Sequence, residues 1–402
     1  MFLGIPIEFY FFALILLFVA LFHNHVLKTA LIGLAIVSLY KIGYAEFKTG
    51  TGINGFADHL VHEWVIITNL LCLLVGFALL SNHFERSNVT DTISVILPNG
   101  WKGAFVLLAF VFFISSFLDN IAAAIIGATI ASRLFKKKVH IGYLAAIVAA
   151  SNAGGSGSVV GDTTTTMMWL AGVPPIEVLH GYIAAFVALF VSGYFAAKQQ
   201  HSYQPIIRSD KSKNNIDWGR IFIVFFILIT AIITNVVVNI KFNYLADYFP
   251  FIGVSVWIAL FILVPLRKPD WSLIPGAFKG SIFLLALVLT ASMMPVEKLP
   301  PASWYSTFGL GFLSSAFDNI PLTALGIKQD NYDWGVLAYA VGYGGSMIWF
   351  GSSAGVAVAN LFPEAKSVGR WVKEGWHVTL AYIIGFAAIM LIWGWNPIPI
   401  PK

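Results

Sequence analysis

The chain has 402 residues, of which 58% are hydrophobic and only 11% are charged, and its mean hydropathy is +0.81. Soluble domains carry about 25% charged residues, so this composition excludes a soluble globular protein and predicts an all-α polytopic membrane protein. The net charge of +5 does not indicate nucleic-acid binding, because basic residues in membrane proteins usually record orientation. The single cysteine, Cys72, excludes a disulfide framework and a multi-cysteine metal site.

Apolar stretches recur along the whole length, and most are long enough to cross a hydrocarbon core of about 30 Å at about 1.5 Å per residue. In the first half they lie at 4–22, 26–46, 64–80, 103–132, 141–172 and 176–197. In the second half they lie at 219–240, 251–265, 274–294, 302–327, 335–361 and 376–395. We interpret the first stretch as a retained helix, because it lacks the basic start and the cleavage site of a signal peptide.

The two halves also resemble each other in sequence. Residues 113–121, FISSFLDNI, match 312–320, FLSSAFDNI, and downstream 153–161, AGGSGSVVG, aligns with 343–351, YGGSMIWFG. Inverted repeats with broken helices are typical of secondary transporters. We therefore predict an inverted-topology repeat.

Two stretches in each half are unusual for transmembrane helices. Those at 103–132 and 302–327 are too long for one upright span, too short for two, and carry Asp-Asn in the middle, which predicts re-entrant hairpins. Those at 141–172 and 335–361 contain glycine clusters, which predict interrupted transmembrane helices. The predicted organisation is a first inverted repeat at 1–197, a cytoplasmic linker at 198–218 and a second inverted repeat at 219–402.

The basic residues sort cleanly if each hairpin returns to the side from which it entered. Each half then crosses the membrane five times, the halves are oppositely oriented, and both termini lie outside. Eighteen of the 24 Lys and Arg residues fall in predicted cytoplasmic loops, as the positive-inside rule requires. These include Arg133, Lys136, Lys137, Lys138, Lys198, Arg208, Lys211, Lys213 and Arg220. The six predicted outside are Lys41, Lys48, Lys241, Lys298, Lys328 and Lys402.

Residues 151–166, SNAGGSGSVVGDTTTT, carry the chemistry expected of an ion site. The glycines weaken a helix and free carbonyl oxygens that can bind a cation, while Asp162 and the Thr163–Thr166 hydroxyls add hard oxygen donors that suit small cations. Glycines and threonines alone would equally suit close helix packing and bonds back to the helix itself. Asp162 favours the functional reading, because a carboxylate inside a membrane costs about 2.5 to 3.5 kcal/mol.

Three aspartates are predicted deep in the bilayer: Asp119 and Asp318 at the hairpin tips, and Asp162. Each also suits a helix cap, but a cap can be a ligand as well. No Lys or Arg is predicted at this depth, so a proton or a mobile cation must meet the charge. Because burial penalises the anion and a bound cation stabilises it, proton and cation compete for these carboxylates. Such competition supports antiport.

Other classes of function find no support. The spacing of Gly155, Gly157 and Gly161 lacks the interval and the βαβ context of a dinucleotide site, and no Walker lysine is present. No GxSxG, HExxH or Ser-His-Asp pattern has a credible context, so we predict no enzyme, no catalytic residues and no cofactor. Of the nine histidines we interpret most as interfacial, with His180 and His377 as candidate pH sensors.

Four segments resemble the NhaD-type bacterial sodium/proton antiporters of the ion transporter superfamily. They are LDNI at 118–121, SNAGGSGSVVGDTTTTMMW at 151–169, FDNIPLT at 317–323 and LAYAVGYGGSMIWFGSSAGVAVANL at 337–361. The resemblance extends from about 64 to 395. It implies a protein of the bacterial cytoplasmic (inner) membrane, a homodimer with a scaffold domain and a moving transport domain, and small ions as partners.

The resemblance also implies the site residues. The implied cation- and proton-binding residues are Asp119, Asn120, Asn152, Asp162, Thr164, Thr165, Asp318 and Asn319. Of these, the implied ligands of transported Na⁺ are Asp119, Asn120, Asn152 and Asp162. The implied supporting polar residues are Ser314, Ser346, Ser352 and Ser353. Members of the family often have a hydroxyl residue after the first Asp-Asn, where this chain has Ala122–Ala124, a departure that bears on ion selectivity.

Three hypotheses follow. The first is a sodium or lithium/proton antiporter working by alternating access. The second is a sodium-coupled carrier of organic anions (citrate, dicarboxylates) or arsenite from the same superfamily. The third is a non-transporting membrane scaffold. Buried acids without buried Lys or Arg favour a transported cation, although helix N-termini can bind anions without basic side chains.

Overall fold

The structure, a computed structural model, describes residues 6–22, 25–89, 97–207, 215–242, 245 and 248–400. The described chain is almost entirely helical, as predicted. Its strands, β1 (Glu46–Phe47) and β2 (Gly50–Thr51), form one small antiparallel hairpin. Residues 208–214 of the predicted linker lie outside the described residues, with Arg208, Lys211 and Lys213, and so does Lys402.

The helices follow the predicted order in both halves. The first half contains α1 (Ile7–Leu21), α2 (Val26–Tyr44), α3 (Gly52–Glu85), α5 (Trp101–Ser115), α6 (Asn120–Leu134), α7 (Ile141–Gly155), α8 (Thr163–Leu170), α9 (Ile176–Leu179) and α10 (Gly181–Tyr203). The second contains α11 (Trp218–Lys241), α13 (Phe251–Leu263), α14 (Ile274–Ser292), α15 (Trp304–Ala316), α16 (Asn319–Gln329), α17 (Trp334–Gly344), α18 (Ser353–Leu361), α19 (Val368–Glu374) and α20 (Trp376–Ile392). The short 3₁₀ turns are η2 (Trp271–Leu273), η3 (Val296–Lys298) and η4 (Pro363–Ala365).

Two helices are longer than their apolar sequence predicts. Helix α3 begins at Gly52 instead of residue 64, because the polar side chains in its first turns, including His59 and Glu63, are buried against other helices. Helix α10 continues to Tyr203, into the predicted linker. There the Gln200 side chain is buried, accepting a hydrogen bond from the His140 backbone N–H and donating one to the Lys138 carbonyl.

Within the described residues, five helical segments are individually long and apolar enough to cross a membrane. They are Val26–Tyr44, Gly52–Glu85, Ile176–Tyr203, Trp218–Val238 and Trp271–Ser292. A sixth is obtained if α19 and α20, bent by 60°, are one span. The remaining apolar helices are shorter, and α7 is one of the two pieces of a predicted interrupted helix. The protein is therefore a multi-pass helical membrane protein.

The helices pack as two sets. We call α1, α2, α3, α11, α13 and α14 the framework helices, because they contact one another in sequence-distant pairs such as α3 with α13 and α2 with α14. We call α5 to α10 and α15 to α20 the site helices, in which α10 packs along α20 and each hairpin packs on an interrupted helix. The sets meet where α14 contacts α16 and where α3 contacts α6 and α8.

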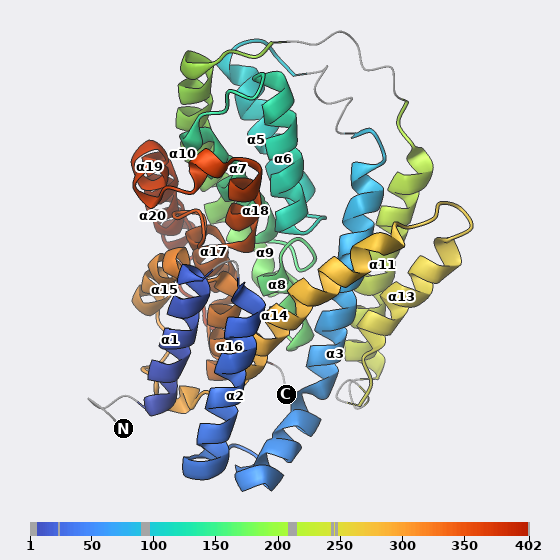
Figure 1. The fold of residues 1–402 in the computed structure, drawn as a ribbon, viewed down its shortest axis with the longest axis vertical. Coiled ribbons are helices and arrows are strands. Elements are labelled where there is room, and N and C mark those ends of the chain that lie inside the picture. The colour runs from blue at the N-terminus through green and yellow to red at the C-terminus, as the bar shows by residue number, and fades with distance from the viewer. Residues whose placement is uncertain are drawn as a thin grey trace.

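The two hairpins, α5 with α6 and α15 with α16, are arranged alike but extend in different directions. Helix α5 packs against α7, and α15 packs in the same way against α17. From its tip α6 runs toward the upper end of the molecule in this view, whereas α16 runs toward the lower end (Figure 1). The packing also crosses between halves, because α18 contacts α6 and α8 contacts α16. This arrangement brings both hairpin tips to the centre of the molecule.

Candidate functional site

The site forms where the two interrupted helices meet the hairpin tips. Glycine makes this meeting possible. A Cβ on Gly154 would lie 2.0 Å from the Phe112 carbonyl oxygen, and one on Gly344 would lie 2.2 Å from the Gly311 carbonyl oxygen. Real Cβ contacts are never this short, so each interrupted helix needs glycine to touch its hairpin.

A pair of serines fixes the same contact in both halves. Ser115 donates a hydrogen bond to the Ser151 carbonyl at 2.6 Å, and Ser314 donates one to the Val341 carbonyl, also at 2.6 Å. These are equivalent positions in the aligned sequences. The predicted residue Ser314 therefore holds the second hairpin against its interrupted helix.

Four helices begin at the site, and each begins with a residue from the predicted set. Asp119 caps α6 and Asp318 caps α16, each accepting a backbone N–H from two residues further on, while Ser352 caps α18. Asp162 is the residue before α8. Because helix N-termini carry partial positive charge, the convergence of these ends stabilises carboxylates at the site without any basic side chain.

Asp162 lies at the centre of a buried hydrogen-bond network and is only 2% exposed. The Asn120 amide donates to Asp162 Oδ1 at 3.0 Å and to Asn152 Oδ1 at 3.0 Å, and the Thr164 hydroxyl donates to Asp162 Oδ2 at 2.6 Å. Asn152 in turn donates to the hydroxyl oxygens of Ser346 at 2.9 Å and Ser352 at 3.2 Å. The network thus joins predicted residues from both halves.

Other threonines of the run hold the loop together. Thr165 donates to the carbonyls of Ser158 at 2.6 Å and Asp162 at 2.9 Å, and Thr166 donates to the carbonyls of Val159 and Asp162, both at 2.9 Å. These bonds fasten the residues between α7 and α8 to the first turn of α8. Thr165, one of the predicted site residues, therefore stabilises the loop between α7 and α8.

The second half of the site is not a copy of the first. Ser353 donates to Asp318 Oδ2 at 3.0 Å, and the buried Asn319 has no hydrogen-bond partner for its amide nitrogen in the described part of the chain. In the aligned sequences Gly342 occupies the place of Asn152, and Ser352 occupies the place of Asp162. The loop carboxylate therefore belongs to the first half alone.

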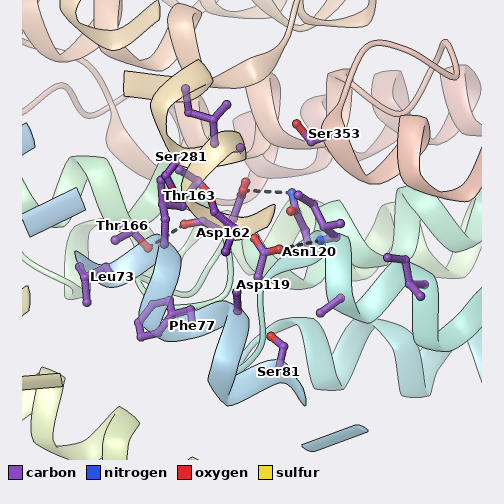
Figure 2. Close-up of a pocket in the computed structure, with 18 of the residues that line it drawn as sticks. Leu73, Phe77, Ser81, Asp119, Asn120, Asp162, Thr163, Thr166, Ser281 and Ser353 are labelled. Atoms are coloured by element: carbon purple, nitrogen blue, oxygen red, sulfur yellow. Dashed lines mark hydrogen bonds between the residues drawn. The ribbon is translucent and has the colours of Figure 1, made fainter. Parts of the chain in front are cut away.

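A cavity of about 630 Å³ lies against these residues (Figure 2). On the site-helix side it is lined by Asp119, Asn120, Asp162, Thr163, Thr166, Asn319 and Ser353, among others. The lining contains no Lys or Arg, and its acidic members in the described chain are Asp119, Asp162 and Glu85. The cavity thus presents the buried Asp162, the half-buried Asp119 and neutral oxygen atoms to any small solute that enters, and Glu85 is exposed at the end of α3.

The opposite wall of the cavity was not predicted from the sequence. It comes from one face of α3, which includes Leu73, Phe77 and Ser81, and from the start of α14, which includes Gly280 and Ser281 (Figure 2). The signal present in the sequence was small, a few Ser and Gly residues in otherwise apolar stretches. Packing of the framework against the site helices creates this wall.

The carboxylates do not form a metal centre made of acids alone. In the described residues no three His, Cys, Asp or Glu side chains lie close enough to hold one metal ion. A cation at this site would need amide, hydroxyl or carbonyl oxygens as well. Asn152 Oδ1 and the Thr164 hydroxyl oxygen lie in this network, whereas Asn120 directs its amide nitrogen toward Asp162 and Asn152.

The two candidate pH sensors lie away from the cavity lining. His180 is hydrogen-bonded through Nε2 to the buried Asp333 at 2.6 Å and stacks on Trp393. His377 contacts Gln199 at 3.1 Å. Both histidines join site helices to one another, and their role as pH sensors stays a prediction.

Comparison with known proteins supports the resemblance seen in the motifs. The profile of the citrate transporter family matches residues 12–344. Sodium/proton antiporter 1 of Arabidopsis thaliana is 26% identical over 386 residues, covering 83% of this chain and 63% of that protein. Sodium/proton antiporter 2 of the same plant is 26% identical over 393 residues, covering 82% of this chain and 86% of that protein.

A bacterial relative shows a similar likeness. The Na⁺/H⁺ antiporter NhaD of Vibrio cholerae serotype O1 is 24% identical over 414 residues, covering 87% of this chain and 83% of that protein. The predicted resemblance to NhaD-type antiporters is thus confirmed at low identity, although the chain spans less than two thirds of the length of Arabidopsis antiporter 1. Since the family profile covers most of the chain, the protein belongs to the citrate transporter family.

Proposed function

We propose that this protein is a secondary active transporter that exchanges sodium or lithium for protons. The observation that carries the proposal is the Asp162 carboxylate, buried beside a cavity whose described lining has no basic side chain. Names of the relatives, sodium/proton antiporter and NhaD, agree with it.

The chemistry of exchange follows from charge. Asn120 and Thr164 donate neutral hydrogen bonds to Asp162, which orient the carboxylate but do not cancel its charge. A buried charge without a counter-charge is costly, so Asp162 takes either a proton or a cation from the cavity. A cation in this position would use Asp119, Asn120, Asn152 and Asp162, with Thr164 holding the carboxylate in place. If the site changes face only when it is occupied, proton flow in one direction drives cation flow in the other.

The proposal includes a topology. The two halves would be inverted repeats in the bacterial inner membrane, with both termini outside, re-entrant hairpins α5–α6 and α15–α16, and a homodimer as the assembly. The matching contacts of Gly154 and Gly344, and of Ser115 and Ser314, support the repeat. The opposite directions of α6 and α16 support the inversion. Framework and site helices would then correspond to a scaffold and a transport unit.

A second candidate is a sodium-coupled carrier of organic anions such as citrate. The size of the cavity, about 630 Å³, and the family to which the chain belongs favour it. The lining argues against it, because carboxylate recognition usually uses Arg or Lys, and the described lining contains neither.

The test compares Asp162→Asn with the unaltered protein in everted vesicles that hold a pH gradient. We expect sodium or lithium to collapse the gradient with the unaltered protein and to leave it intact with Asp162→Asn, because an amide cannot take up a proton. Asp58→Asn, on an exposed position of α3, is the control and should exchange normally. Exchange by Asp162→Asn at the unaltered rate would refute the proposal, and citrate uptake without proton exchange would favour the anion carrier.

A further inference from the structure

The cavity extends from the carboxylates toward one end of the molecule only. Along α3 its lining starts at Leu70 and continues to Glu85, the last residue of that helix. Along α14 it starts at Leu273, just before the helix, and stops at Leu284. The cavity therefore points to the end of the molecule where α3 finishes and α14 begins.

At the other end, an ion pair joins the framework to the site helices. Glu63 of α3 pairs with Lys328 of α16. Glu63 lies seven residues before Leu70, about 10 Å along the helix away from the cavity. Lys328 lies nine residues after Asn319, about 13 Å from the hairpin tip. The pair thus lies beyond the carboxylates, on the side to which the cavity does not extend.

The surroundings of Glu63 belong to the framework. His59, one turn earlier on α3, contacts the Ser292 hydroxyl at 2.9 Å, and Lys41 of α2 donates to the Met293 carbonyl at 2.8 Å. All three of Glu63, His59 and Lys41 are buried. Lys328 therefore brings the second hairpin onto a polar cluster that otherwise ties α2, α3 and α14 together.

We propose that the Glu63–Lys328 ion pair closes the site on the face opposite the cavity and separates once in every transport cycle. This inference rests on the proposed antiport, in which the site must open to each face in turn. A half-buried ion pair suits such a closure: the Glu63 side chain is 5% exposed and that of Lys328 is 24% exposed, and the attraction between the charges is offset in part by the cost of withdrawing them from water. Hydrating the two side chains when the face opens thus costs little overall.

The inference is tested by joining the two positions covalently. Cysteines are introduced as Glu63→Cys and Lys328→Cys in a Cys72→Ala background, and linked with a reducible bis-methanethiosulfonate reagent. We expect exchange in vesicles to stop on linking and to return to at least half its starting rate after reduction, because α3 and α16 cannot separate while they are joined.

The matched control uses another ion pair of the same helix. Arg86, just after the end of α3, pairs with Asp270, just before η2 and α14, so this pair joins the ends of two framework helices. Arg86→Cys with Asp270→Cys, linked in the same way, should exchange at the rate of the unlinked protein. Loss of exchange only in the Glu63/Lys328 pair would support the closure.

Neutralising one charge, and then exchanging the two charges, gives a second test that does not depend on linking. Glu63→Gln should slow exchange several-fold, because it leaves the Lys328 ammonium without its partner, whereas Glu63→Lys with Lys328→Glu should restore exchange. Unchanged exchange in the linked protein, with Asp162→Asn still inactive, would overturn the closure and leave the antiport standing. Absence of cation/proton exchange in the unaltered protein would instead overturn the antiport, and the closure with it.

Discussion

At the scale of single residues, Asn120 connects the two halves of the hydrogen-bond network around Asp162. Its amide nitrogen donates to both Asn152 and Asp162, so it joins a neutral side chain to a carboxylate. The equivalent residue of the second half, Asn319, is equally buried but its amide nitrogen has no partner among the described residues. The same residue type therefore joins two side chains in the first half, whereas in the second half its amide nitrogen donates no hydrogen bond to a described residue.

This contrast predicts unequal effects on stability. Asn120→Ala leaves two buried oxygen atoms without their shared donor, and an unsatisfied buried group costs about 1 to 3 kcal/mol. Asn319→Ala loses no hydrogen bond of its amide nitrogen. In thermal unfolding of the purified protein in detergent, we expect Asn120→Ala to lower the melting temperature more than Asn319→Ala does. Equal losses would contradict the role given to Asn120.

At the scale of elements, the interrupted helices depend on glycine for their contact with the hairpins. Gly154 lies against the Phe112 carbonyl and Gly344 against the Gly311 carbonyl, so closely that a Cβ on either glycine would clash with the carbonyl oxygen. The interruption is therefore not merely a weak point in a helix. It lets the backbone reach the hairpin and leaves Asp162 at the start of a new helix.

A pair of Gly→Ala substitutions tests this packing. Gly154→Ala forces hairpin and helix apart, and overpacking of this kind costs about 1 to 3 kcal/mol or more. Gly276→Ala, in α14, meets no atom within 4 Å and should be neutral or stabilise the helix by up to about 1 kcal/mol. Urea or thermal unfolding of the two variants measures the difference. A Gly154→Ala protein as stable as Gly276→Ala would show that the hairpin contact is loose.

At the scale of the whole molecule, the site exists because two sets of helices meet. The side that carries Asp119 and Asp162 comes from the hairpins and interrupted helices, and the facing side, which is apolar except for a few residues such as Ser81 and Ser281, comes from α3 and α14 (Figure 2). The framework helices thus form one side of the cavity that leads to the site. Under the proposed exchange, we expect access to change when α3 and α14 move relative to the site helices.

Filling the cavity should block transport without unfolding the protein. Gly280 lines the cavity on α14, and a Cβ there meets nothing within 4 Å. Gly280→Trp should therefore fold normally and lose most of its sodium/proton exchange. Gly369→Trp, at an exposed glycine of α19 with equally open surroundings, is the control. Normal exchange by Gly280→Trp would place the transport path elsewhere.

Much of the fold could be predicted from local sequence. Apolar length predicted the helices, the paired Asp-Asn sequences predicted the hairpin turns before α6 and α16, and the glycine cluster predicted the break between α7 and α8. The start of α3 was missed, because the buried polar residues His59 and Glu63 look like a loop until their partners Ser292 and Lys328 are known. Local patterns contain no information about partners that are far away in the chain.

The sequence by itself determined the class of the protein, and it predicted the chemistry of the site. Hydropathy fixes which segments enter a membrane, and Asp162 among glycines and threonines is costly there unless it binds something. Only the tertiary structure decided that Asn120 and Asn152 meet at Asp162, that α3 and α14 wall the cavity, and that Lys328 reaches Glu63. These contacts join residues far apart in the chain, and they follow from how whole helices pack against one another.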